Sequence, residues 1–140
     1  EKNYPYIAYL HPYFQKEFKK VLKPETVLIG SNYSVWGNGN KNLQMIDPKD
    51  NTMFKVGSHN IERGIVDMIG LGRQSFADPL LPKKLADGNE KDIHFCTLCD
   101  NCLELLIRQE HIGCCTYNKY YTNVLVNVRK EKGKLTQNHT

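Results

Sequence analysis

The sequence contains no long hydrophobic run. No stretch approaches the roughly 20 apolar residues that cross a bilayer, and the polar first residues, Glu1 to Asn3, do not resemble a signal peptide. Internal repeats and low-complexity segments are also absent. These absences argue against a membrane protein and against a repeat array. The 140 residues suffice for one domain with its own core.

A strong charge of either sign is missing as well. The formal net charge is only +4, and the basic residues gather near the two ends of the chain. They are Lys16, Lys19, Lys20 and Lys23 near the start, and Arg129, Lys130, Lys132 and Lys134 near the end. Such runs usually form solvated faces or tails, so the sequence disfavours nucleic-acid binding.

Cysteine is absent outside one short window. All five cysteines lie between residues 96 and 115, whereas a disulfide framework would scatter them along the chain. The clustering predicts a metal or iron–sulfur site in a reducing compartment. We therefore expect a cytoplasmic protein.

The first third of the chain reads as an aromatic segment followed by a helix. Residues 1–10 have an extended character, and a helix is predicted to begin at His11-Pro12, because proline is tolerated in a first turn. Phe14 and Phe18 recur at helical spacing and are expected to face the core. The helix should end before Pro24.

Two short apolar runs predict buried parallel strands. They are Thr26–Ile29, which ends at Gly30-Ser31-Asn32, and Met68–Leu71, which ends at Gly72-Arg73. Uninterrupted apolar runs are typical of strands covered on both faces, and their alternation with helices is typical of an α/β protein. The carboxyl ends of parallel strands meet at one edge, where ligands bind.

The turn after the second run is a candidate phosphate site. Gly70 and Gly72 would let a ligand approach the backbone closely, and Arg73 would offer a planar, always charged fork beside N–H groups of a following helix. A plain tight connection is the alternative. The segment is a poor dinucleotide fingerprint, because Ser75 stands where the third glycine belongs.

The remaining segments predict short elements. Residues 33–58 read as a long loop with turn clusters at 36–40 and 47–51, which should contain some short structure or a lid. Asn60–Ile65 predicts a brief helix that Asn60 caps and Gly64 ends. Leu80–Ala86 predicts another helix that stops near Gly88.

The segment from Val66 to Leu85 resembles a known family, the NADH:flavin oxidoreductases of the old yellow enzyme type. The matching residues are Asp67, Gly70, Gly72, Arg73, Ala77, Asp78, Pro79, Lys84 and Leu85. They are similar to the last barrel strand of that family, and residues 26–34 are similar to the strand before it. The resemblance extends over roughly residues 1–120.

This resemblance implies the carboxyl-terminal portion of a (β/α)8 TIM barrel, namely its last two strands, with a cysteine-rich extension. Residues 1–90 would form the partial FMN-binding barrel, and residues 91–140 the cysteine-rich segment and tail. Gly30, Ser31, Gly72 and Arg73 would contact the FMN phosphate. A full barrel needs about 250 residues, so the family's catalytic residues would lie on earlier strands. We expect a piece of a longer enzyme that is inactive alone.

The cysteine spacing suits a [4Fe–4S] cluster. Cys96, Cys99 and Cys102 form a C-x2-C-x2-C run, and Cys114 follows after eleven residues. The 2,4-dienoyl-CoA reductase branch of the family carries a similar run whose third gap is one residue longer. The implied ligands are Cys96, Cys99, Cys102 and Cys114. Cys115 could replace Cys114 or be a buried thiol.

Other states of these thiols stay open from the sequence alone. Zinc is a competing metal, with His94 or His111 as a substitute ligand, and the thiols could also hold no metal.

The full enzyme is expected to pass hydride from NAD(P)H through FMN to a small unsaturated or carbonyl substrate. An exposed sheet edge would favour a homo-oligomer. The alternative is a cysteine-rich zinc-binding interaction module without enzymatic activity.

Overall fold

The computed structural model describes residues 4–36 and 52–137 and is mostly helical. The elements are α1 (Tyr4–Lys19), β1 (Ile29–Gly30), η1 (Tyr33–Trp36), α2 (Met53–Glu62), β2 (Met68–Ile69), α3 (Arg73–Ala77), α4 (Leu81–Ala86), η2 (Glu90–Asp92), α5 (Asn101–Ile107) and α6 (Lys119–Gln137). The chain divides into two units, Glu1–Gln74 and Ser75–Thr140. The sequence-based division after residue 90 stays a prediction. No described helix is both long and apolar enough to cross a membrane.

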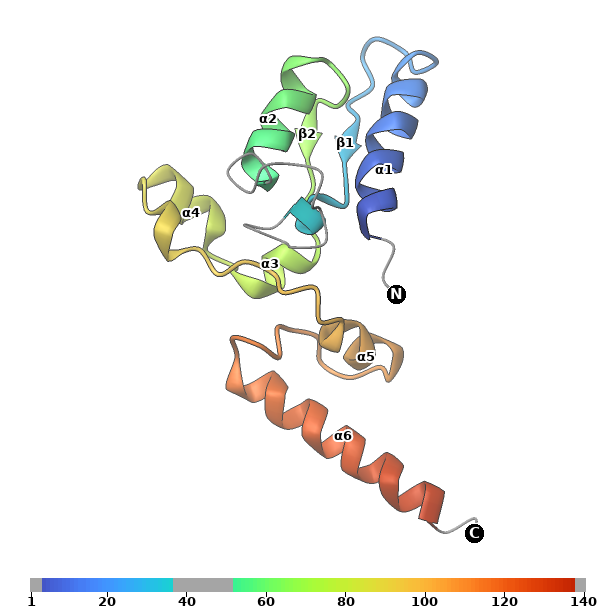
Figure 1. The fold of residues 1–140 in the computed structure, drawn as a ribbon, viewed down its shortest axis with the longest axis vertical. Helices are drawn as coiled ribbons and strands as arrows, with labels where there is room; N and C mark the ends of the chain where they lie inside the picture. Colours follow the sequence, from blue (N-terminus) through green and yellow to red (C-terminus); the bar gives the residue numbers. More distant parts are fainter. Residues whose placement is uncertain (1–3, 37–51, 138–140) are drawn as a thin grey trace. The chain divides into compact units, whose positions relative to one another are not determined.

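A small parallel sheet forms the centre of the first unit. β1 pairs with β2 in parallel, with Ile29 opposite Met68 and Gly30 opposite Ile69. Figure 1 shows the two strands side by side between α1 and α2. A Cβ on Gly57 of α2 would lie 3.2 Å from Ile69 Cγ1, a tight contact, so glycine favours the close packing of this helix on β2. The predicted parallel pairing is confirmed, and the assignment of the two strands to the end of a barrel stays a prediction.

The expected burial of the strands on both faces is wrong. Ile29 is 57% exposed and its partner Met68 is 55% exposed, whereas Gly30 is buried and Ile69 is partly buried. Side chains alternate between the two faces of a strand. One face of the described pair is therefore packed against the unit's core, and the other carries exposed apolar side chains.

The first helix begins earlier than the sequence predicted. α1 starts at Tyr4, so Pro12 lies inside the helix and residues 4–10 are not extended. Pro5 rather than Pro12 occupies the first turn, where a missing N–H has no cost. Packing of Ala8 and of the Tyr9 ring, whose centroid lies 6.2 Å from that of Trp36, offsets the hydrogen bond that Pro12 removes.

The far end of α1 follows one prediction and departs from another. The helix ends at Lys19, before Pro24, as predicted. Phe14 and Phe18 are about half exposed, so the prediction that they face the core is wrong. An ion pair between Lys19 and Asp67 joins this end of α1 to the start of β2, and the same carboxylate accepts the N–H of Leu28.

The second helix is longer than predicted and is capped elsewhere. Thr52 is the N-cap of α2 and accepts the N–H of Lys55 at 3.2 Å. Asn60 is therefore an internal residue, and its Nδ2 donates to the Tyr33 hydroxyl at 2.8 Å instead of capping. Gly64, with φ of +64°, follows the helix end as predicted. Of the turn clusters expected at 36–40 and 47–51, only Trp36 is described, as the last residue of η1, and the rest lie outside the described residues.

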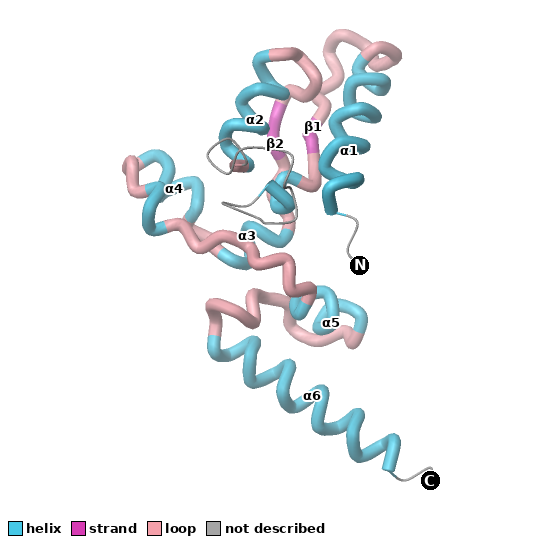
Figure 2. Tube along the Cα trace, viewed as in Figure 1, coloured by secondary structure: helices cyan, strands magenta, loops and turns pink. Residues whose placement is uncertain are grey.

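In the second unit, a loop leads from η2 to α5 without regular structure between residues 93 and 100 (Figure 2). α4 ends before Gly88, which has φ of +70°, as predicted.

α5 packs against α6 around a core of Leu105, Cys115 and Leu125. A Cβ on Gly113 would overlap the Tyr121 ring, so this position requires glycine.

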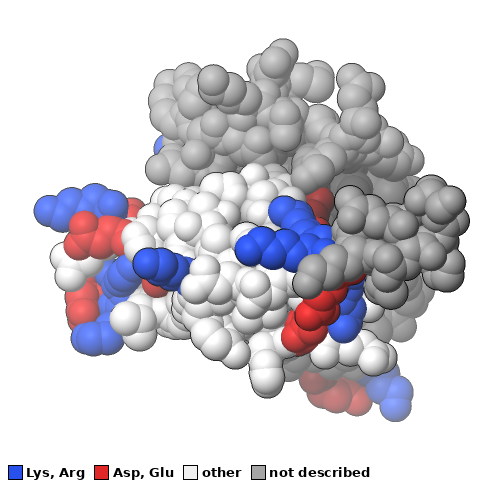
Figure 3. Space-filling view, turned by 90° about the horizontal axis from the view of Figure 1, so that it is seen from below, with Lys and Arg blue, Asp and Glu red and all other residues white. Residues whose placement is uncertain are grey.

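The last helix, α6, extends from Lys119 to Gln137 and so continues well beyond Val128. Leu125 and Val128 are both buried, three residues apart, which is the spacing of one helix face. This buried face holds the first part of α6 in place, and the residues of α6 after Val128 are mostly polar. In the described part of the face drawn in Figure 3, both basic and acidic side chains are visible.

Candidate functional site

The two predicted phosphate-binding segments meet at the carboxyl ends of β1 and β2. The Gly70 N–H donates to the Gly30 carbonyl at 2.6 Å, which continues the ladder beyond the strands. Ser31 is exposed next to Gly30. Gly72 follows Gly70 after one intervening residue, and Arg73 comes next. The structure thus brings both segments to one edge of the sheet within the same unit.

The glycines at this edge have different physical roles. A Cβ on Gly30 would lie 2.8 Å from Val66 Cγ1 and 3.0 Å from the Tyr33 ring, so glycine is needed there for packing. A Cβ on Gly72 would meet nothing within 4 Å. The backbone at Gly72 is therefore open to a ligand, and Arg73, partly buried, begins α3 directly beside it.

Asn32 adds a donor that the sequence analysis did not assign to the site. Its φ is +73°, a left-handed conformation that asparagine tolerates better than most residues. Its Nδ2 is buried and has no hydrogen-bond partner in the described structure. An unsatisfied buried amide is costly, and this one directly follows Gly30-Ser31. The sequence signal that could have identified Asn32 was a side chain with amide donors at the carboxyl end of a predicted strand.

Asp78 joins α4 to the segment that leads into the cysteines. The carboxylate is 3% exposed and accepts from Lys84 Nζ at 2.5 Å, from the His94 N–H at 2.9 Å and from the Leu80 N–H at 3.1 Å. Burial alone would raise the pKa of Asp78, but Lys84 and the two N–H groups outweigh it and lower the pKa. The motif residue Asp78 is thus a structural centre of the second unit.

Acid should therefore destabilise this unit through Asp78. A lowered folded-state pKa adds stability above the ordinary value of 3.8, and this stability is lost as pH falls through the folded-state pKa. We expect the urea midpoint to fall between pH 5 and pH 3 more steeply in the native protein than in Asp78→Asn. Parallel curves for the two proteins would contradict this role.

Cys99 lies in a tight loop that faces the second cysteine segment. Leu98 and Asp100, on either side of it, have φ of +55° and +60°. Cys99 Sγ lies 3.6 Å from Thr116 Oγ1. Burial would raise the pKa of Cys99, but hydrogen bonds from the Asn101 N–H, Thr116 and Thr97 lower it overall. The surroundings therefore favour the thiolate, the form that binds metals.

Cys115 has the opposite environment. It is 7% exposed within the α5–α6 core, and its Sγ lies 3.5 Å from the Tyr121 carbonyl oxygen. Burial, followed by the charges of Cys114, Cys99 and Cys102, raises the pKa of Cys115 to about 11.

The five cysteines all lie in the described part of the chain, and none forms a disulfide. Among the described residues, no three His, Cys, Asp or Glu side chains form a group that could hold a metal ion.

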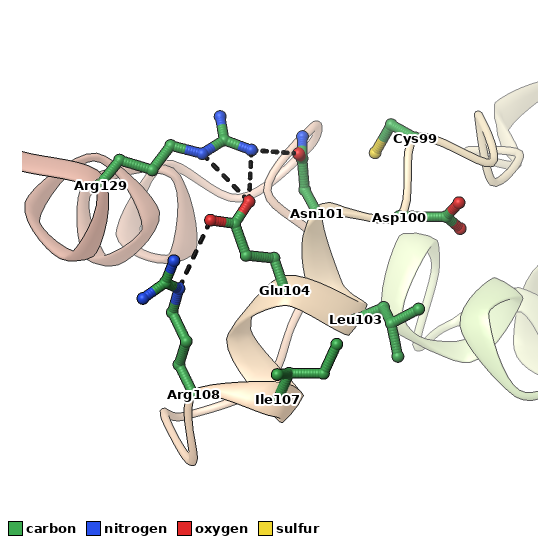
Figure 4. A pocket seen from close by; sticks show the side chains of 8 residues that line it. All are labelled: Cys99, Asp100, Asn101, Leu103, Glu104, Ile107, Arg108 and Arg129. Atoms are coloured by element: carbon green, nitrogen blue, oxygen red, sulfur yellow. Dashed lines mark hydrogen bonds and ion pairs between the residues drawn. The ribbon is translucent and has the colours of Figure 1, made fainter. Parts of the chain in front are cut away.

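An ion network joins α5 to α6 beside Cys99 (Figure 4). Arg129 donates through Nε and Nη2 to Glu104 Oε2 at 3.1 and 2.6 Å, and through Nη2 to Asn101 Oδ1 at 3.0 Å. Arg108 lies 3.5 Å from the other Glu104 oxygen. These side chains and Cys99 line one depression. The sequence analysis placed Arg129 in a solvated run, although its helical distance from Leu125 indicated a packed helix.

Comparisons with known proteins give partial matches, and no protein-family model matches the chain. The chain is 46% identical over 43 residues to the dimethylamine dehydrogenase of Hyphomicrobium sp. (strain x), covering 31% of this chain and 6% of that protein. It is 36% identical over 55 residues to the bilirubin reductase of Mediterraneibacter gnavus (strain CC55_001C), covering 39% of this chain and 9% of that protein.

A solved structure is also similar, that of the 6-hydroxypseudooxynicotine amine oxidase from Pseudomonas geniculata N1. The match has a TM-score of 0.55 at 26% identity and covers 75% of this chain but 13% of that protein. All three relatives are far longer than the parts that match. A dehydrogenase, a reductase and an amine oxidase are all oxidoreductases, and partial similarity to the three supports an oxidoreductase-type function.

Proposed function

We propose that this chain is the carboxyl-terminal part of an FMN-dependent NAD(P)H oxidoreductase of the ene-reductase or dienoyl-reductase type. The observation that carries the proposal is the meeting of Gly30-Ser31 and Gly72-Arg73 at one edge of a parallel strand pair. In α/β barrels a phosphate commonly binds between the loops that follow the last two strands. β1 and β2 would be these strands.

The residues at this edge fit a phosphate group. Gly72 leaves its backbone open, and the buried Asn32 Nδ2 lacks an acceptor that a phosphate oxygen would supply. The Ser31 hydroxyl and the Arg73 guanidinium would add hydrogen bonds, the latter charge-assisted. When bound, FMN supplies hydride transfer between a nicotinamide and a small unsaturated or carbonyl substrate. The role of these residues is to bind and orient it.

The cysteine segment would hold a [4Fe–4S] cluster through Cys96, Cys99, Cys102 and one of the adjacent pair Cys114 and Cys115. Thiolates are the usual ligands of such clusters, and hydrogen bonds favour the thiolate of Cys99. The described side chains do not form a group that could hold a metal ion in this structure, so the proposal rests on the type of donor and on the cysteine spacing. Cys114 is the ligand that the spacing favours. The charges of Cys99 and Cys102 help to raise the pKa of Cys115, so Cys115 is also near enough to be considered, and serine variants must decide between Cys114 and Cys115.

The proposed enzyme would draw its catalytic residues from barrel strands outside this chain. The chain alone would therefore be inactive, and it would associate with a second copy or with the rest of the barrel through its exposed strand side chains. The substrate and the choice between NADH and NADPH would then depend on those strands.

Cofactor analysis of the full-length protein, purified without oxygen, tests the proposal. We expect about one acid-releasable FMN and about four irons per chain, and oxidation of NADH or NADPH that depends on an added α,β-unsaturated ketone. A protein that contains zinc in place of iron, without flavin, would contradict the proposal and favour the cysteine-rich interaction module.

A further inference from the structure

Two segments of equal length, residues 30–34 and residues 70–74, are joined by a hydrogen bond at each end. At one end the Gly70 N–H donates to the Gly30 carbonyl at 2.6 Å. At the other end the Gln74 N–H donates to Ser34 Oγ at 3.3 Å. The two segments and these two bonds form a closed frame at the carboxyl ends of β1 and β2. The residues proposed to bind the phosphate all lie on this frame.

The bond between Ser34 and Gln74 is the buried end of the frame. Ser34 is 4% exposed and Gln74 is 0% exposed, whereas Ser31 and Gly72, between the two bonds, are exposed. An N–H that loses its acceptor in a buried place is costly, because water cannot replace the acceptor there. The Ser34 hydroxyl therefore holds the two segments together on the side that is closed to solvent.

The same bond acts on the backbone of Arg73. The Gln74 N–H belongs to the peptide group that follows Arg73, and a peptide group is planar. Fixing this N–H therefore fixes the orientation of the whole group and limits the backbone of Arg73, the first residue of α3. Ser34 lies on the other segment of the frame, two residues after Asn32. It thus links the position of Arg73 to that of the first segment.

We propose that Ser34 is a positioning residue for the phosphate, because its bond across the frame fixes the spacing between Asn32 and Arg73. The inference rests on the proposed function. Donors from both segments can share one phosphate group only when their spacing suits it, and groups that are already ordered lose less entropy on binding. Asn32 contributes a buried Nδ2 that has no partner in the described structure. Ser34 itself would contact Gln74 and not the phosphate.

The test compares the binding of FMN with that of riboflavin, which lacks the phosphate, to the flavin-free full-length protein. The riboflavin dissociation constant divided by the FMN dissociation constant measures what the phosphate contributes. In Ser34→Ala this ratio should fall about tenfold, because FMN binding weakens while riboflavin binding stays as in the native protein. Quenching of flavin fluorescence during titration gives both constants.

Tyr33→Phe is the matched control. It removes a hydroxyl from the neighbouring buried residue of η1 and breaks the hydrogen bond of 2.8 Å from Asn60 Nδ2. The ring that packs beside Gly30 stays in place. We expect a lower urea midpoint with the native ratio of the two flavin constants. A ratio that falls equally in Tyr33→Phe and Ser34→Ala would show a general loss of structure and would overturn the proposal.

The results distinguish a failure of this role from a failure of the proposed function. If the native protein prefers FMN, but Ser34→Ala keeps the native ratio or weakens both flavins equally, Ser34 does not position the phosphate site. If the native protein binds both flavins equally or binds neither, the phosphate assignment itself is wrong. If Ser34→Ala does not fold, Ser34→Cys decides. Its sulfur is a weak acceptor, so a reduced ratio supports the proposal and the native ratio refutes it.

Discussion

Arg73→Ala is expected to release FMN from the full-length enzyme. A charge-assisted hydrogen bond contributes about 1.5–3 kcal/mol. If the Arg73 guanidinium donates two of them to the phosphate, as proposed, its loss should raise the FMN dissociation constant at least a hundredfold. The fold should survive, because the backbone of α3 and the adjacent Gln74 N–H, which donates to Ser34 Oγ, are unchanged. Flavin fluorescence during titration of the apoprotein gives the dissociation constant.

Arg63→Ala is the matched control for this variant. Arg63 lies in the same unit, at the end of α2, and is exposed. It should bind FMN as the native protein does. If Arg73→Ala kept its full flavin content after dialysis, the phosphate assignment would be wrong, and the turn at Gly72 would be a tight connection only.

Cys99→Ser is expected to remove iron without emptying the flavin site. Serine lacks the soft thiolate that iron–sulfur clusters require, and Cys99 is the cysteine whose surroundings favour the thiolate. Iron should fall from about four atoms per chain to near zero. FMN should stay bound, because Gly72 and Arg73 belong to the first unit and Cys99 to the second. Colorimetric iron analysis and the flavin absorption spectrum measure the two outcomes separately.

Serine variants of the adjacent pair complete this experiment. One of Cys114→Ser and Cys115→Ser should lose iron as Cys99→Ser does, and the other should keep it. Loss of stability without loss of iron is expected if Cys115 is only a core residue, since it packs with Leu105 and Leu125. Native iron content in Cys99→Ser would remove the cluster from the proposal.

The fold could be predicted wherever a local pattern determines the structure. Apolar runs followed by glycine indicated both strands, although β1 and β2 are only two residues long each and β1 begins at the end of its predicted run. Gly64 and Gly88 correctly marked helix ends. Prediction failed where two local signals compete. Pro5 and Pro12 both suit a first turn, and the sequence does not show which one the packing of Ala8 selects.

The candidate site also has features that could be predicted from the sequence and features that could not. Gly72 and Arg73 stand next to each other in the chain, so their combination was visible from the sequence. The unsatisfied Asn32 Nδ2 became visible only when its neighbours were placed. The contact of Arg129 with Asn101 joins residues 28 positions apart, and nothing local in a basic run indicates such a partner.

The exposed strand side chains have a consequence for handling the isolated chain. Val27, Ile29 and Met68 form an apolar strip on a short sheet, and strips of this kind attract each other in concentrated solution. Light scattering of the isolated chain should therefore rise with concentration and decrease with mild detergent. Crystallisation or nuclear magnetic resonance would then be better started from the full-length enzyme than from these 140 residues.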